Sequence, residues 1–134
     1  EALLAACPGL RVLKDPTRGG LAAAVNELAE AAGAGMRIEE PRVPIRSAVA
    51  GACAALGLDP LNVANEGKFV VVVPPDEAEA ALAAMHGHPL GREAAEIGEV
   101  LPAPDRGPRV TLRTRIGGER VLEMPYGEDL PRIC

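Results

Sequence analysis

The chain has 134 residues, enough for one ordinary domain that can bury a real core. Hydrophobic residues make up 48% and charged residues 25%, which is typical of a globular protein. The net charge of −5 repels phosphate backbones, and one Phe, one Tyr and no Trp leave little aromatic surface on which bases could stack. Nucleic acid is therefore not expected as a partner.

No stretch has the length or the flanks of a signal peptide or a membrane helix, which predicts a cytoplasmic protein with no membrane partner. The chain starts at Glu1 rather than Met, so we expect a fragment of a larger protein. Cys7, Cys53 and Cys134 form no CxxC pair, which argues against a zinc site or a disulfide framework. The first two lie among Ala and Leu and are expected to be small buried hydrophobic residues.

Helical and strand patterns follow one another along the chain. Strand patterns occupy residues 10–14, 36–38, 69–73 and 97–101, and a hairpin turns at Gly117-Gly118 between 110–116 and 119–124. Helical patterns occupy residues 1–7, 19–32, 46–56 and 76–85.

The run Phe69-Val-Val-Val-Val73 is apolar on both faces, which predicts a central strand. The irregular alternation of strands and helices, with an antiparallel end, predicts an α+β domain in which helices cover a mixed sheet. We expect this domain to span residues 1–125, and residues 126–134 to form a mobile tail.

Three places carry candidate chemistry, and the first is Asp-Pro-Thr-Arg-Gly-Gly-Leu at residues 15–21. Gly19 and Gly20 let a ligand approach the backbone, and the helix start offers N–H groups to an anion. Arg18 adds a planar donor for phosphate or carboxylate. The alternative is an ordinary turn in which Thr17 caps the helix and Arg18 is solvated. No Gly-Lys-Ser/Thr follows, so this is not a Walker loop.

The second place is Asn-Glu-Gly-Lys at residues 65–68, just before the valine run. An Asn and a Glu there can coordinate magnesium, orient an amide or move a proton. The alternative is a surface turn in which Glu66 pairs with Lys68. His86 and His88 lack a third ligand nearby, so they are expected to be loop residues and no metal site is predicted.

The third place is the tail, Tyr-Gly-Glu-Asp-Leu-Pro-Arg-Ile-Cys at residues 126–134. Because no chain follows Cys134, its thiol can enter a narrow cleft. Gly127 provides a hinge, while Pro125 and Pro131 limit the entropy lost on docking. The alternative is a frayed end whose last residue happens to be Cys. A farnesylation box is excluded, because it needs Cys four residues from the end.

Together and in this order, these motifs resemble the HypE family of hydrogenase maturation proteins. The matching segments are Asp-Pro-Thr-Arg-Gly-Gly-Leu, Ala-Asn-Glu-Gly-Lys, His-Pro-Leu-Gly and the terminal Pro-Arg-Ile-Cys, which is the most specific. The family belongs to the superfamily of aminoimidazole ribonucleotide synthetase and selenophosphate synthetase. Those enzymes pair an amino-terminal ATP-binding domain, absent here, with a carboxy-terminal α+β domain.

The resemblance implies that the carbamoyltransferase HypF loads a carbamoyl group onto the Cys134 sulfur as a thiocarbamate. ATP, bound with Mg²⁺ mainly by the absent domain, then phosphorylates the carboxamide oxygen. Loss of phosphate leaves a thiocyanate, and the cyanide ligand passes to iron on the HypC–HypD complex for the [NiFe]-hydrogenase. The intact protein is expected to be a homodimer.

Site roles follow from the same resemblance. Glu66 is the candidate base for the amide proton, and Asn65 orients the amide. Arg18, the Gly19 and Gly20 amides and Thr17 hold phosphate charge at the helix start. Two other functions stay open: a docking module that only presents the terminal thiol, and a kinase or synthetase of the superfamily that acts on a free small molecule.

Overall fold

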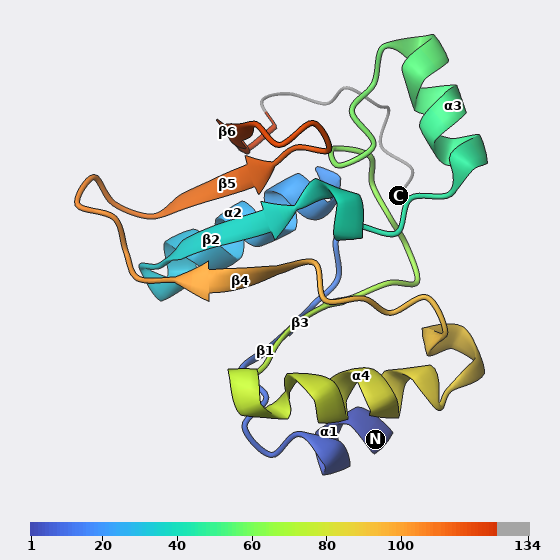
Figure 1. The fold of residues 1–134 in the computed structure, drawn as a ribbon, viewed down its shortest axis with the longest axis vertical. Coiled ribbons are helices and arrows are strands. Elements are labelled where there is room, and N and C mark those ends of the chain that lie inside the picture. Colours follow the sequence, from blue (N-terminus) through green and yellow to red (C-terminus); the bar gives the residue numbers. More distant parts are fainter. Residues whose placement is uncertain (126–134) are drawn as a thin grey trace.

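The main sheet has four strands in the order β4–β2–β5–β6, in a computed structural model that describes residues 1–125 (Figure 1). β2 pairs antiparallel with β4 and parallel with β5, and β5 pairs antiparallel with β6. The sheet is therefore mixed, and the predicted α+β class is confirmed. The strands are β2 (Gly35–Glu39), β4 (Gly98–Leu101), β5 (Arg109–Arg113) and β6 (Glu119–Val121).

Helix α2 (Gly20–Ala32) covers one face of this sheet and builds the core. Ala22, Val25 and Ala29 recur at helical spacing, so they form one stripe toward the strands. Small alanines let the helix axis lie close to the sheet, which excludes water from the strand residues beneath. The buried partners of that stripe are Met36, Ile38, Leu61, Val110, Leu112 and Leu122.

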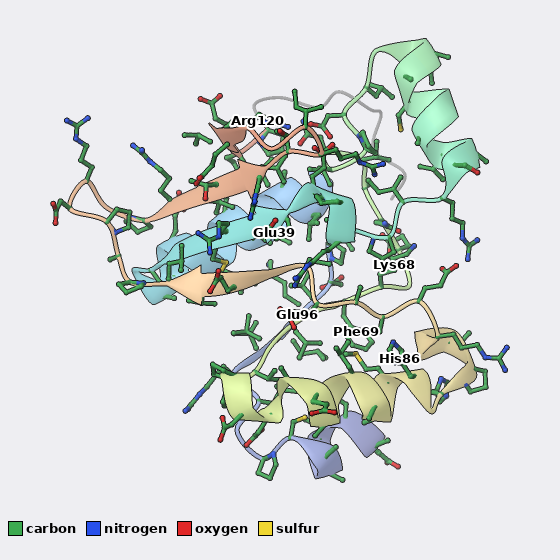
Figure 2. All side chains as sticks on the ribbon, in the orientation of Figure 1. Glu39, Lys68, Phe69, His86, Glu96 and Arg120 are labelled. Carbon is green, nitrogen blue, oxygen red and sulfur yellow. The ribbon has the colours of Figure 1, made fainter. Side chains whose placement is uncertain are left out.

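The other face of the main sheet is polar. Glu39 lies there (Figure 2), and its Oε1 is 3.8 Å from Arg37 Nε and 3.9 Å from an Arg113 guanidinium nitrogen. Arg37 also pairs with Glu99 on β4. Apolar and polar residues alternate along β2, as its sequence predicts, because the two faces of the sheet have different surroundings.

A second layer consists of the β1–β3 ribbon and two helices, and lies below the main sheet in Figure 1. Helix α1 packs on α4, and the Glu77 carboxylate accepts the Gly9 N–H at 2.9 and 3.1 Å. The elements are α1 (Ala2–Ala6), β1 (Val12–Lys14), β3 (Val70–Val72), the 3₁₀ turn η2 (Pro75–Glu77) and α4 (Ala78–His86).

The valine run is not a central strand, so that prediction is wrong. Among the described residues, β3 pairs only with β1, and Phe69 is half exposed. A central strand needs partners on both edges, and in the main sheet β2 and β5 have them. An apolar run indicates that both faces of a strand are covered, but it does not indicate how many neighbours the strand has.

Helix α3 (Ser47–Leu56) projects away from both layers (Figure 1). The helix predicted at residues 46–56 is confirmed, but of its apolar residues Val49, Cys53 and Leu56 only Cys53 is buried. Two short 3₁₀ turns, η1 (Glu40–Arg42) and η3 (Pro89–Gly91), complete the fold. Within residues 1–125, no helix is long and apolar enough to cross a membrane. The predicted tail, residues 126–134, lies outside the described residues.

We expect Leu112→Ala to lower the free energy of unfolding by about 2–5 kcal/mol, because it leaves a cavity between α2 and the sheet. Leu112 is 1% exposed, whereas Leu90 is 91% exposed. Leu90→Ala is therefore the matched control, with an expected change within about 0.5 kcal/mol. Urea denaturation of both variants checks the prediction, and equal losses would contradict this description of the core.

Candidate functional site

Two of the predicted motifs lie side by side, although they are far apart in the sequence. The Asn65 N–H donates to the Pro16 carbonyl at 3.0 Å. A few residues away, the Ala22 N–H donates to the Leu61 carbonyl at 2.9 Å. These backbone bonds join the first motif and the start of α2 to the segment before β3, so the two motifs are neighbours in the fold.

Gly20 makes this close approach possible. Its φ is +62°, and a Cβ at this position would lie 2.5 Å from the carbonyl oxygens of Leu61 and Val63. Its N–H donates to the Thr17 carbonyl at 3.3 Å. This glycine therefore serves the packing of two backbone segments, because the carbonyls of the second segment occupy the space where a side chain would be.

The helix start differs from the predicted turn. Gly19, with φ +71°, is the N-cap of α2, and no side chain caps the helix. The alternative in which Thr17 caps the helix is wrong, because Gly19 is the N-cap and two consecutive glycines with positive φ separate Thr17 from the helix. Thr17 and Arg18 instead line a polar cavity of about 170 Å³ with Lys14, Asp15, Ala24 and Glu27.

Charges of both signs surround that cavity. Lys14 Nζ is 2.7 Å from Glu27 Oε2, so this pair balances itself. Arg18 is exposed on the wall, and among the described residues no carboxylate pairs with it. A guanidinium in this position has its donors available for an anion that arrives from outside. Phosphate binding by Arg18 stays a prediction.

The second motif has a different internal contact from the expected one. Lys68 Nζ donates to Asn65 Oδ1 at 2.8 Å, so the Glu66–Lys68 pair of the alternative surface turn is not formed (Figure 2 labels Lys68). This bond orients the Asn65 side-chain amide in the segment before β3. The backbone N–H of Asn65 is itself bonded to the Pro16 carbonyl. Glu66 is exposed, so its carboxylate is accessible to solvent.

Two of the three cysteines are buried. Cys7 is 1% exposed and Cys53 is 7% exposed, as the sequence predicts. Burial, and secondarily the Glu77 carboxylate, raises the pKa of the Cys7 thiol, which therefore stays protonated and a poor nucleophile. Cys134 lies outside the described residues.

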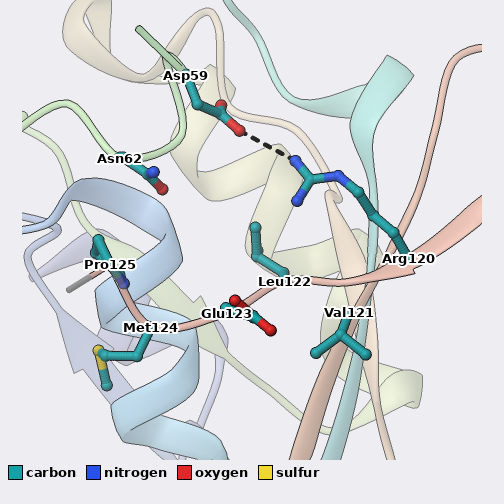
Figure 3. A pocket seen from close by; sticks show the side chains of 8 residues that line it. All are labelled: Asp59, Asn62, Arg120, Val121, Leu122, Glu123, Met124 and Pro125. Atoms are coloured by element: carbon teal, nitrogen blue, oxygen red, sulfur yellow. Dashed lines mark hydrogen bonds and ion pairs between the residues drawn. The ribbon is translucent and has the colours of Figure 1, made fainter.

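The described chain ends beside the first motif. Figure 3 shows a cavity of about 260 Å³ whose wall contains the last strand and the residues after it, up to Pro125. A Cβ at Gly19 would lie 3.1 Å from Pro125 Cγ. Pro125, the last described residue, therefore lies against the loop that contains Arg18.

Three residues of this region were not predicted. The Asn26 side chain donates to the Ala22 and Leu122 carbonyls, both at 2.9 Å. Arg120 pairs with Asp59 at 3.0 Å (Figure 3). Two features of the sequence could have pointed to them. Asn26 is a polar residue next to the apolar stripe of α2, and Asp59 precedes Pro60 in a turn where its carboxylate accepts the Leu61 N–H. Neither signal gives the partner, which comes from another part of the chain.

The family of AIR synthase related proteins, C-terminal domain, matches residues 1–110. The chain belongs to this family. A carbamoyl dehydratase HypE from Cupriavidus necator is 54% identical over 132 residues, 98% of this chain but 37% of that protein. The chain thus spans little more than a third of the length of the relatives it matches.

Solved structures agree. A crystal structure of E. coli HypE has a TM-score of 0.89 at 48% identity, over 98% of this chain and 41% of that chain. A crystal structure of a HypE–HypF complex matches with a TM-score of 0.86 at 41% identity, and the match covers 93% of this chain and 40% of that chain. A crystal structure of a HypE in complex with ATP matches with a TM-score of 0.85 at 44% identity, and the match covers 94% of this chain and 38% of that chain. The resemblance to HypE inferred from the motifs is confirmed.

We expect Gly20→Ala to destabilise the protein more than Gly33→Ala does. Both glycines have φ near +60°, but a Cβ at Gly33 would meet nothing within 4 Å. Gly33→Ala should cost about 1 kcal/mol, for the left-handed backbone alone. Gly20→Ala should cost about 1–3 kcal/mol more, because the facing segment must move. Equal midpoints in urea would contradict the tight packing between the two motifs.

Proposed function

We propose that this chain is the carboxy-terminal part of an ATP-dependent carbamoyl dehydratase, and that Cys134 carries the carbamoyl group. The observation that carries the proposal is the position of Pro125 against Gly19, in a loop bonded to the second motif. Nine residues span at most about 30 Å, a length that would allow the terminal thiol to reach both motifs. The relatives named carbamoyl dehydratase HypE support the same reaction.

The reaction converts a thiocarbamate, Cys–S–C(=O)–NH₂, to a thiocyanate, Cys–S–C≡N. The carboxamide oxygen attacks the terminal phosphorus of ATP, ADP leaves, and nitrogen loses one proton. The C–O bond then breaks, phosphate leaves with the oxygen, and nitrogen loses its second proton. Since the oxygen leaves as phosphate rather than as hydroxide, the protein needs a nearby base and a positive site for phosphate charge.

The described residues are of the types that these steps require. The exposed Glu66 carboxylate takes a nitrogen proton, and the Asn65 amide orients the carboxamide. Arg18 and the Gly19 backbone stabilise phosphate from the cavity wall that Thr17 shares. The Gly20 amide, already bonded to Thr17, contributes to the shape of the loop rather than to binding.

The remaining components come with the rest of the protein. ATP and Mg²⁺ bind mainly to an amino-terminal part, since the chain carries no Walker loop. A HypF-type carbamoyltransferase loads Cys134, a complex of the HypC–HypD type receives the cyanide ligand, and the whole protein is a homodimer. Because the chain spans little more than a third of its relatives, it acts by itself only as a module that presents Cys134.

Cys134→Ser should abolish carbamoyl loading in the full-length protein, because a serine hydroxyl at neutral pH is a far poorer nucleophile than a partly ionised thiol. Cys7→Ser and Cys53→Ser are the controls, and both should load normally, since these cysteines are buried. The measurement is mass analysis after incubation with the carbamoyltransferase, carbamoyl phosphate and ATP. Label on Cys7 or Cys53 would refute the assignment, and unimpaired turnover without the tail would favour a synthetase acting on a free small molecule.

Glu66→Gln should leave loading intact but slow conversion to thiocyanate by about 10²–10⁴-fold, the usual contribution of a positioned base. Mass analysis of the tail peptide after ATP addition should show the carboxamide persisting. Glu30→Gln, an exposed carboxylate on α2, is the matched control and should convert at the normal rate. If the Glu66 variant also converts normally, Glu66 is not the base.

A further inference from the structure

The β1–β3 ribbon is apolar but incompletely covered. All six residues of its two strands, Val12–Lys14 and Val70–Val72, are at least partly exposed. The pairing places Leu13 opposite Val71, and Phe69 precedes Val71 by two residues, so these three side chains share one face of the ribbon. Leu13 is 57% exposed and Phe69, labelled in Figure 2, is 51% exposed. Because a two-stranded ribbon is only marginally stable by itself, it needs a further strand or a covering layer.

The outer edge of β3 differs from the other strand edges of residues 1–125. Three other strands there have one unpaired edge, and each contains a charged residue: Lys14 in β1, Glu99 in β4 and Glu119 in β6. Charged side chains are a common means by which an edge strand avoids pairing with another strand. β3 consists of three valines and has no such protection. Its composition is that of a strand with a neighbour on each edge.

The rest of the protein would join the chain next to this ribbon. This inference rests on the proposed function, in which a longer amino-terminal part precedes Glu1. Helix α1 packs on α4, and the chain passes from α1 directly into the ribbon, where the Arg11 N–H donates to the Val72 carbonyl at 2.9 Å. A covalently attached segment has a high effective concentration, which favours it over a second copy of the chain as the neighbour of β3.

We propose that the β1–β3 ribbon is the docking surface for the amino-terminal part of the full-length protein, which adds a strand to the outer edge of β3 and covers Leu13 and Phe69. The backbone N–H and C=O groups of that edge bond the added strand. The surface that faces Leu13 and Phe69 is apolar, because a charge buried there would have no partner. In the full-length protein β3 then has two neighbours, whereas among the described residues it lies at an edge.

Hydrogen exchange in the full-length protein, measured residue by residue, tests the added strand. In a two-stranded ribbon alternate N–H groups of each strand face outward, whereas a strand with two neighbours has all of them bonded. We expect every amide of Val70–Val72 to exchange about tenfold or more slowly than the outward amides of β6, the matched edge strand. Fast exchange at alternate residues of β3 would overturn the proposal, and so would protection that is lost on dilution, because that result assigns the edge to a second copy.

Thiol labelling tests the cover over the ribbon face. Leu13→Cys and Phe69→Cys are made in the full-length Cys134→Ser protein, and peptide mass analysis follows maleimide labelling at each introduced thiol. Val49→Cys on α3 is the matched control, since Val49 is 45% exposed. Both ribbon thiols should react about tenfold or more slowly than the control, and equal rates would overturn the proposal.

Neither measurement needs ATP or a carbamoyl donor, so the two proposals fail separately. Slow exchange and slow labelling in a protein that forms no thiocyanate would refute the proposed reaction and leave the docking surface in place. Normal thiocyanate formation with fast exchange at β3 would refute the docking surface alone.

Discussion

The close approach of α2 to the backbone of residues 61–63 is the constraint on which the rest of the structure depends. Gly20 permits it, the Ala22 N–H and the Leu61 carbonyl hold it, and the buried Leu61 side chain joins it to the core. Because the same contact brings Pro16 within hydrogen-bonding distance of Asn65, the candidate site is a direct consequence of how the core packs.

Stability and chemistry are divided between different surfaces. The stripe of α2 and the inner face of the sheet exclude water, and this burial supplies most of the stabilisation. The polar face carries exposed ion pairs such as Arg37–Glu99, which each contribute little. Arg18 and Glu66, the residues to which the proposed function gives chemical roles, lie outside both surfaces in exposed loops.

Local sequence patterns predicted much of the secondary structure, but they did not predict contacts between segments that are far apart in the chain. The helix α2, the alternation along β2 and the Gly117-Gly118 hairpin follow from periodicity and turn chemistry, so they could be predicted from the sequence. The valine run was placed wrongly, because strand order depends on partners from elsewhere in the chain. The contact between the two motifs could not be predicted either. A pair of glycines permits the close approach of a ligand and of another backbone segment alike, and here it is a backbone segment that approaches Gly20.

The most direct test of the central claim follows one oxygen atom. The full-length protein would be prepared with a thiocarbamate on Cys134 whose carboxamide carries oxygen-18, and ATP would then be added. The account predicts that thiocyanate formation transfers the heavy oxygen to inorganic phosphate, one atom for each thiocyanate formed, because the oxygen leaves as part of phosphate. Heavy oxygen released as water, or thiocyanate formed without ATP cleavage, would contradict it.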